Sequence, residues 1–82
     1  MILVDIGVPS LGQNYNFSLD ENAIISNLLE EISEMIVQKE KCEGALEGKK
    51  FMLCSMEREE ILRENRTLRS YEIENGSRLL FV

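Results

Sequence analysis

The hydrophobic pattern of this chain changes its period once, near residue 20, and this change limits the folds that the chain can adopt. Before it, apolar side chains recur at every second position: Ile2, Val4, Ile6 and Val8, then Tyr15, Phe17 and Leu19. Such alternation predicts two β-strands with one buried face each. The five residues from Pro9 to Gln13 include a proline and a glycine, which are typical of turns. Residues 2–19 therefore predict a β-hairpin.

After the change, apolar side chains recur at the spacing of an α-helix: Ile25, Leu28, Leu29, Ile32, Met35 and Ile36. The spacing predicts a helix over residues 23–38, with Asp20 or Asn22 as its N-cap. Because this single helix must cover one face of the sheet, we expect its apolar stripe to be buried in the core rather than to dock a partner.

The second half of the chain contains three shorter apolar runs that predict strands: 51–54, 61–62 and 77–82. The last run is apolar on both faces, as is typical of a central strand, so we expect it beside the first strand. The polar segments 39–50 and 56–60 predict an irregular connection and a solvated turn. A compact polar stretch, 65–76, ends at the turn dipeptide Asn75-Gly76.

This order of elements, without a repeat or a linker, predicts a single domain over residues 1–82. The predicted fold class is α+β, with a mixed sheet of four or five strands packed on one helix. That arrangement is the β-grasp. In the last strand, Leu79 and Phe81 are expected to face the helix.

The open face of this sheet is the candidate binding surface. The third strand does not alternate, so either Met52 and Cys54 or Phe51 and Leu53 could face outward, and we favour the first pair. A contiguous apolar patch would indicate a binding surface, whereas scattered exposed apolar residues are normal. A contact between two copies is an alternative use of the same face. The predicted partner-binding residues are Met52, Cys54, Leu80 and Val82.

The composition disfavours several classes of function. The chain has 82 residues with 9 basic and 15 acidic side chains, and its net charge of −6 disfavours binding to the phosphates of nucleic acids. It has no histidine, so it lacks the usual general base at neutral pH and the commonest metal ligand. One disulfide between Cys42 and Cys54 is possible, but we expect two free thiols, and two cysteines cannot supply the usual ligands of zinc. We expect no catalytic activity, no cofactor and no metal.

The sequence shows no signal-peptide pattern and no apolar run near the roughly 20 residues of a membrane span. We therefore expect a cytoplasmic domain that does not insert directly into a membrane. Glu57, Glu59 and Glu60 are expected to form a solvated turn rather than a metal site, because calcium loops need a defined ligand spacing.

The C-terminal part of the chain resembles the corresponding end of ubiquitin. The shared skeleton consists of Arg66-Thr67-Leu68, Tyr71-x-Ile73, Ser77-x-Leu79 and the final Val82. Within the ubiquitin-like proteins, the chain resembles the small bacterial YukD/EsaB family of type VII secretion. The residues that carry this second resemblance are Ile2-Leu3-Val4-Asp5-Ile6, Val8-Pro9, Leu29-Glu30-Glu31-Ile32-x-Glu34-Met35-Ile36 and Asn75-Gly76-Ser77-Arg78-Leu79.

These resemblances imply a ubiquitin-like accessory or adaptor protein that is not conjugated to other proteins. Its partner would be a cytoplasmic domain of the secretion machinery, either the ATPase or a channel subunit, and its location could be peripheral to the inner face of the membrane through that partner. In ubiquitin, the outer face of the third and fifth strands carries an apolar patch that most partners use. A weak homodimer is also possible.

Conjugated relatives act through a flexible tail that ends in two glycines, whereas this sequence ends in Phe81-Val82. We therefore expect that the chain is not activated as a modifier. Two alternatives stay open. One is a ubiquitin-like modifier or sulfur carrier whose C-terminal glycines are missing from this sequence, and the other is a stand-alone β-grasp regulatory module of an unrelated enzyme.

Overall fold

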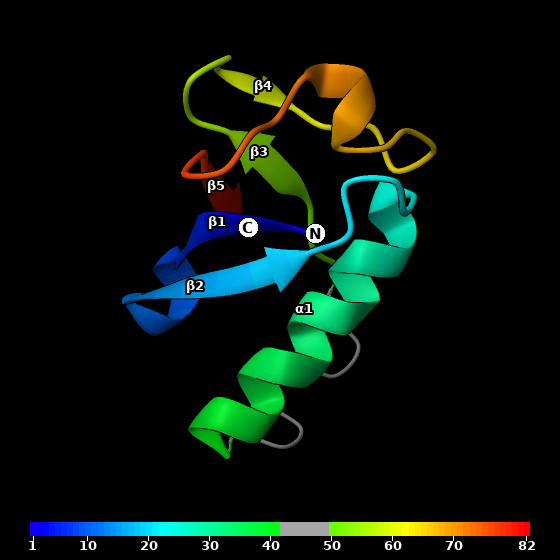
Figure 1. Cartoon of the computed structure of the whole chain (residues 1–82). Coiled ribbons are helices and arrows are strands. Elements are labelled where there is room, and N and C mark those ends of the chain that lie inside the picture. The colour runs from blue at the N-terminus through cyan, green and yellow to red at the C-terminus, as the bar shows by residue number, and fades with distance from the viewer. Residues whose placement is uncertain (42–49) are drawn as a thin grey trace.

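A computed structural model describes residues 1–41 and 50–82. In this part of the chain, five strands form one mixed sheet in the order β2-β1-β5-β3-β4, and one α-helix packs on a single face of it (Figure 1). The elements are β1 (Ile2–Val8), β2 (Gln13–Leu19), α1 (Ile25–Glu40), β3 (Leu53–Ser55), β4 (Glu60–Ile61) and β5 (Arg78–Phe81), with short 3-10 helices at Pro9–Leu11 and Arg69–Tyr71. The predicted α+β fold class is therefore confirmed.

The predicted hairpin is present, and its register is continuous from the Ile2↔Leu19 pair to the Val8↔Gln13 pair. The alternating apolar residues of both strands point to the inner face, toward α1, and are buried. β5 runs parallel to β1 and pairs with it from Asp5↔Arg78 onward, which confirms the predicted central position of the last strand.

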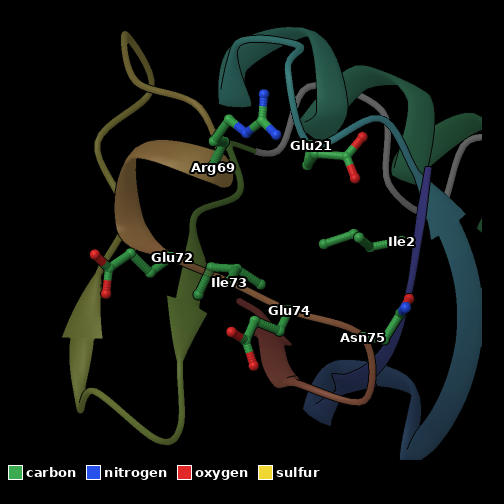
Figure 2. Close-up of a pocket in the computed structure, with 7 residues that line it drawn as sticks. All are labelled: Ile2, Glu21, Arg69, Glu72, Ile73, Glu74 and Asn75. Carbon is green, nitrogen blue, oxygen red and sulfur yellow. The ribbon is translucent and has the colours of Figure 1, made fainter.

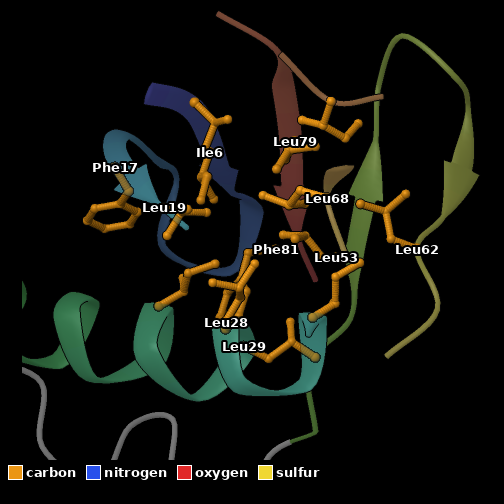
Figure 3. Packing of buried hydrophobic residues seen from close by; sticks show 14 of the residues in the cluster. Ile6, Phe17, Leu19, Leu28, Leu29, Leu53, Leu62, Leu68, Leu79 and Phe81 are labelled. Carbon is orange, nitrogen blue, oxygen red and sulfur yellow. The ribbon is translucent and has the colours of Figure 1, made fainter. Parts of the chain in front are cut away.

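The inner face of the sheet and the apolar stripe of α1 form one hydrophobic core (Figure 3). The prediction that the stripe is buried is confirmed, since Ile25, Leu28, Ile32 and Ile36 are fully inaccessible to solvent. Phe81 is the largest of the fully buried side chains and stacks on Phe51 with ring centroids 4.3 Å apart. The remaining core residues are Ile2, Val4, Ile6, Val8, Tyr15, Phe17, Leu19, Leu29, Leu53, Leu62, Leu68, Ile73 and Leu79.

The predicted start of the helix and its predicted N-cap are wrong. The helix begins at Ile25, and Ile24 is an extended N-cap without a side-chain hydrogen bond. The carboxylate of Asp20 instead accepts the backbone N–H of Asn22 within the preceding turn. The first helical N–H groups donate to carbonyls from a distant segment: Ile25 to Arg66 at 2.8 Å and Ser26 to Glu64 at 3.0 Å. Tertiary contacts thus replace the local cap that the sequence suggested.

At its other end, α1 continues to Glu40, two residues beyond the predicted end, and Lys41 adopts a left-handed conformation with a φ of 50°. The first two residues of the predicted connection at 39–50 are therefore helical. Most of the connection, together with Cys42, lies outside the described residues.

The predicted third strand, 51–54, is displaced by about one residue, since β3 covers Leu53–Ser55. Met52 nevertheless extends the ladder, because its backbone exchanges two hydrogen bonds with Val82. The predicted strand at 61–62 is also displaced, because β4 covers Glu60–Ile61.

The polar stretch before β5 is anchored by two buried side chains, Leu68 and Ile73. The predicted turn at Asn75-Gly76 is confirmed: Gly76 has a φ of +84°, a conformation that glycine adopts without steric cost. This turn is tied to β1, since Asn75 Oδ1 accepts the N–H of Leu3 at 2.8 Å and Gly76 donates to the Leu3 carbonyl. Among the described residues, no helix combines the length and the apolar character needed to cross a membrane.

Candidate protein-binding face

The pairing of β3 with β5 determines which residues reach the outer face of the sheet, the face opposite α1. Leu53 is paired with Phe81, and both side chains are fully buried on the inner face. Because side chains alternate along a strand, the next pair, Cys54 and Leu80, points outward. The backbone pair of Met52 and Val82 follows on the same side, and both residues are about 40% exposed. The structure therefore brings all four predicted partner-binding residues together on the outer face.

Two further apolar residues join this group, and the sequence did not identify them. Ile61 pairs directly with Cys54 across β3 and β4, so it shares the outer face, and it is 56% exposed. Met56 follows β3 and is exposed beside Leu80. Side chains alternate along a strand, so one residue of 61–62 must face outward, but only the pairing with β3 shows that it is Ile61. We call this surface the outer-face patch, which consists of Met52, Cys54, Met56, Ile61, Leu80 and Val82.

The patch contains a shallow pocket whose walls differ in chemistry. Cys54, Ile61 and Leu80 supply the apolar part of its lining, and Glu59 and Glu60 supply carboxylates. Cys54 is a free, half-buried cysteine. An apolar floor with charged groups at the margin is suited to binding a protein side chain, since the rim of an interface is usually polar.

A glycine on β1 forms the boundary of the patch. Gly7 pairs with Leu80 on one side and with Asn14 on the other. A Cβ atom at this position would lie 3.1 Å from a methyl carbon of Leu80 and 3.0 Å from Oδ1 of Asn14. The missing side chain of Gly7 thus leaves room for the Leu80 side chain on the outer face.

The acidic turn between β3 and β4 is held by specific contacts at two of its three glutamates. The Glu57 carboxylate accepts a hydrogen bond from the backbone N–H of Arg78 at 2.9 Å. The Glu60 carboxylate accepts one from the Nε–H group of Arg58 at 2.8 Å. This hydrogen bond to Glu60 raises the pKa of the Arg58 guanidinium above its usual range. Glu59 has a φ of +53°, which is uncommon for a residue other than glycine.

The described residues contain no group of three or more cysteine, aspartate or glutamate side chains arranged to hold a metal ion. The glutamates of the turn are instead used within the fold or face solvent at the margin of the patch.

A second pocket lies at the end of the sheet, beside Ile2 and Ile73, and is lined by the acidic residues Glu21, Glu72 and Glu74 (Figure 2). The Glu21 carboxylate pairs with the amino group of Met1 at 3.0 Å, and this hydrogen bond lowers the pKa of Glu21. Because that carboxylate is already paired and the pocket is mostly polar, we regard the outer-face patch as the stronger candidate site.

No protein-family model matches the chain, and no curated protein matches it. Several solved structures are similar to it. The EccD5 ubiquitin-like domain from Mycobacterium xenopi is similar with a TM-score of 0.79 and 26% identity, over 99% of this chain and 91% of that one. The N-terminal ubiquitin-like domain of the 4931431F19Rik protein gives a TM-score of 0.73 at 23% identity, over 99% and 72%.

The ubiquitin-like domain of Arabidopsis thaliana At2g32350 gives a TM-score of 0.69 at 22% identity, over 99% of this chain and 74% of that one. Together with the strand order and the single helix of the described residues, these similarities show that the chain has the ubiquitin-like fold.

Proposed function

We propose that this protein is a non-conjugated ubiquitin-like adaptor of a bacterial type VII secretion system, which binds a protein partner through the outer-face patch. The observation that carries the proposal is the patch itself: six apolar side chains from β3, β4, β5 and their flanking residues share one face, and four of them are exposed. Contiguous exposed apolar surface is typical of a site that binds another protein.

The choice of secretion system is supported by two similarities. The sequence resembles the YukD/EsaB family in its first strand, its helix and its last turn. The fold is similar to that of the mycobacterial EccD5 ubiquitin-like domain, which we take to represent the same secretion system. We therefore propose a cytoplasmic domain of the secretion ATPase or of a channel subunit as the partner, and reversible docking without catalysis or a cofactor as the mechanism. The protein would reach the membrane only through this partner.

The proposal is tested by measuring the affinity of the purified protein for the cytoplasmic domains of the ATPase and of the channel subunit. Leu80→Glu and Met52→Glu place a charge within the patch, and we expect each to lower the affinity by about 30-fold or more, the effect of a 2 kcal/mol hot spot. Asn27→Glu is the control, because it adds the same charge at an exposed position of α1, away from the outer face of the sheet.

Circular dichroism and denaturant unfolding verify that the variants fold. Normal binding by both patch variants would show that the patch is not the docking surface. Failure of the wild-type protein to bind either domain would instead overturn the assignment to this secretion system and leave the ubiquitin-like fold unaffected.

A further inference from the structure

The two edges of the sheet differ in how well they are protected against pairing with another strand. β4, at one edge, has only two residues and follows a highly charged turn (Figure 1). β2, at the other edge, has seven residues in continuous register with β1. Natural proteins usually protect an edge strand by making it short, by a charged side chain, by proline, by a bulge or by covering it with another segment. β4 is short and carries a charge. β2, with the sequence QNYNFSL, is long and has no charge, proline or bulge, and among residues 1–41 and 50–82 no backbone hydrogen bond joins another segment to its outer edge.

The directions of the backbone groups on β2 follow from the contacts of β1. Leu3 and Asp5 direct their backbone groups toward the β5 side, since the Leu3 carbonyl accepts the N–H of Gly76 and Asp5 donates to Ser77. The alternate residues of β1 therefore bond to β2, where their partners are Leu19, Phe17, Tyr15 and Gln13. It follows that the remaining residues of β2 direct their N–H and C=O groups away from the sheet; these are Asn14, Asn16 and Ser18.

We infer that β2 is a self-association edge, at which a second copy of this chain adds its own β2 in antiparallel orientation. Pairing about a two-fold axis at Asn16 aligns the whole strand: Asn16 faces Asn16 of the other copy, and Asn14 faces Ser18. All three outward-directed residues are then paired, and each pair exchanges two backbone hydrogen bonds.

Charge favours a second copy as the occupant of this edge. The chain has a net charge of −6, so two copies repel each other over most of their surfaces. None of the charged residues of the chain lies in β2; the outer-face side chains that would meet across the axis are amides and hydroxyls, and the inner-face side chains are those of Tyr15 and Phe17. This strand is therefore a surface along which two identical acidic domains can approach without placing like charges opposite each other.

This arrangement is independent of the proposed function but compatible with it. A two-fold axis perpendicular to the sheet places the outer faces of both copies on the same side. The outer-face patch lies on β3, β4 and β5, away from β2, so the pairing leaves both patches accessible and directed the same way. A dimer would thus offer two docking surfaces to a partner that contains repeated sites.

The test uses the protein alone. Sedimentation velocity from micromolar to millimolar concentration should show a monomer–dimer equilibrium for the wild-type chain. Asn16→Lys and Asn16→Glu should each weaken dimerisation several-fold, because like charges would then lie directly opposite each other at the axis. An equimolar mixture of the two variants should restore the dimer, since opposite charges then meet.

The control is Ile61→Lys, which adds a charge at the opposite edge and within the patch, and which should leave dimerisation unchanged. Hydrogen exchange supplies a second readout: the amides of Asn14, Asn16 and Ser18 should become protected as the concentration rises. A wild-type chain that stays monomeric at millimolar concentration would overturn the inference. Dimerisation that Ile61→Lys abolishes and Asn16→Lys leaves intact would do so as well, because it would locate the contact on the patch.

Discussion

The outer face of the sheet has two halves of opposite chemistry, although both lie above the same hydrophobic core. One row of paired residues crosses all five strands and shows the change: Asn14, Gly7, Leu80, Cys54 and Ile61. On the hairpin half, formed by β1 and β2, the outer side chains are mainly polar or absent, with Leu3 as the exception. On the other half, the outer-face patch is apolar.

The comparison of the two halves shows which outer-face side chains the fold itself requires to be apolar. The hairpin half shows that a strand of this sheet needs apolar side chains only on its inner face, because polar residues occupy most of its outer face. The apolar side chains of the patch are therefore not required by the architecture. The proposed binding of a partner would account for them, and the variants below test whether the two halves of the outer face differ as this proposal requires.

The largest expected effect is that of Leu79→Ala, compared with Leu80→Ala. The two leucines are neighbours on β5, but Leu79 is fully buried under α1 and Leu80 is half-buried on the outer face. We expect Leu79→Ala to reduce the free energy of unfolding by about 2–5 kcal/mol, as is usual for a core leucine, and Leu80→Ala to reduce it by about 1 kcal/mol. Urea denaturation measures both. Equal losses would show that the patch is part of the core.

A smaller effect is expected at the margin of the patch for Glu57→Ala. This substitution removes the acceptor of the Arg78 backbone N–H at the start of β5. We expect the free energy of unfolding to fall by about 1 kcal/mol, the net value of a hydrogen bond. Glu57→Gln is the matched control, because its amide oxygen can still accept that N–H, and it should recover part of the stability. If both variants are as stable as the wild type, the contact does not hold the turn.

In the same turn, Glu59→Gly is expected to act in the opposite direction. Glu59 has a φ of +53°, a conformation that glycine adopts more easily than glutamate. Relief of this conformation should increase the free energy of unfolding by about 0.5–1 kcal/mol. The greater freedom of glycine in the unfolded chain opposes part of this gain, so we expect a smaller net increase. Thermal and urea unfolding measure the change. A clear loss of stability would mean that the Glu59 side chain makes a stabilising contribution that outweighs its backbone conformation.

The smallest effect on stability is expected for Gly7→Ala, at the boundary between the two halves. Alanine favours the strand over glycine by about 0.5–1 kcal/mol, but its Cβ would approach the ends of the Asn14 and Leu80 side chains closely. Because both side-chain ends can move, we expect a net change of about 0.5 kcal/mol or less. The methyl resonances of Leu80 should shift in the NMR spectrum. Unchanged resonances would show that Gly7 does not control the position of Leu80.

Much of the fold could be predicted from the sequence because its long elements carry regular patterns. Apolar residues alternate along 2–8 and 15–19, and the stripe from Ile25 to Ile36 keeps helical spacing, so both the element types and their buried faces follow from local sequence. Boundaries that depend on distant residues could not be predicted. The helix starts at Ile25 because carbonyls of residues 64 and 66 receive its first N–H groups, and no local signal reveals those partners.

The candidate site divides in the same way. Alternation along the last strand, together with the need to bury one of its faces, was enough to place Leu80 and Val82 on the outer face. The sequence favoured Met52 and Cys54 as outward residues of β3 but left the alternative open, because the run Phe51-Met52-Leu53-Cys54 is apolar throughout. The pairing of Leu53 with the buried Phe81 shows that Leu53 faces the core, so Met52 and Cys54 face outward.

The sequence by itself determined the hairpin, the helix, the central last strand and most of the core, since hydrophobic period is a local property of the chain. Only the tertiary structure decided that Ile61 and Met56 complete the outer-face patch, that Gly7 borders it, and that β2 is an edge of the sheet. These features depend on strand order and register. The strand order joins residues far apart in the chain, such as those of β1 and β5, and the run at 51–54 does not alternate, so it carries no local pattern that selects its register.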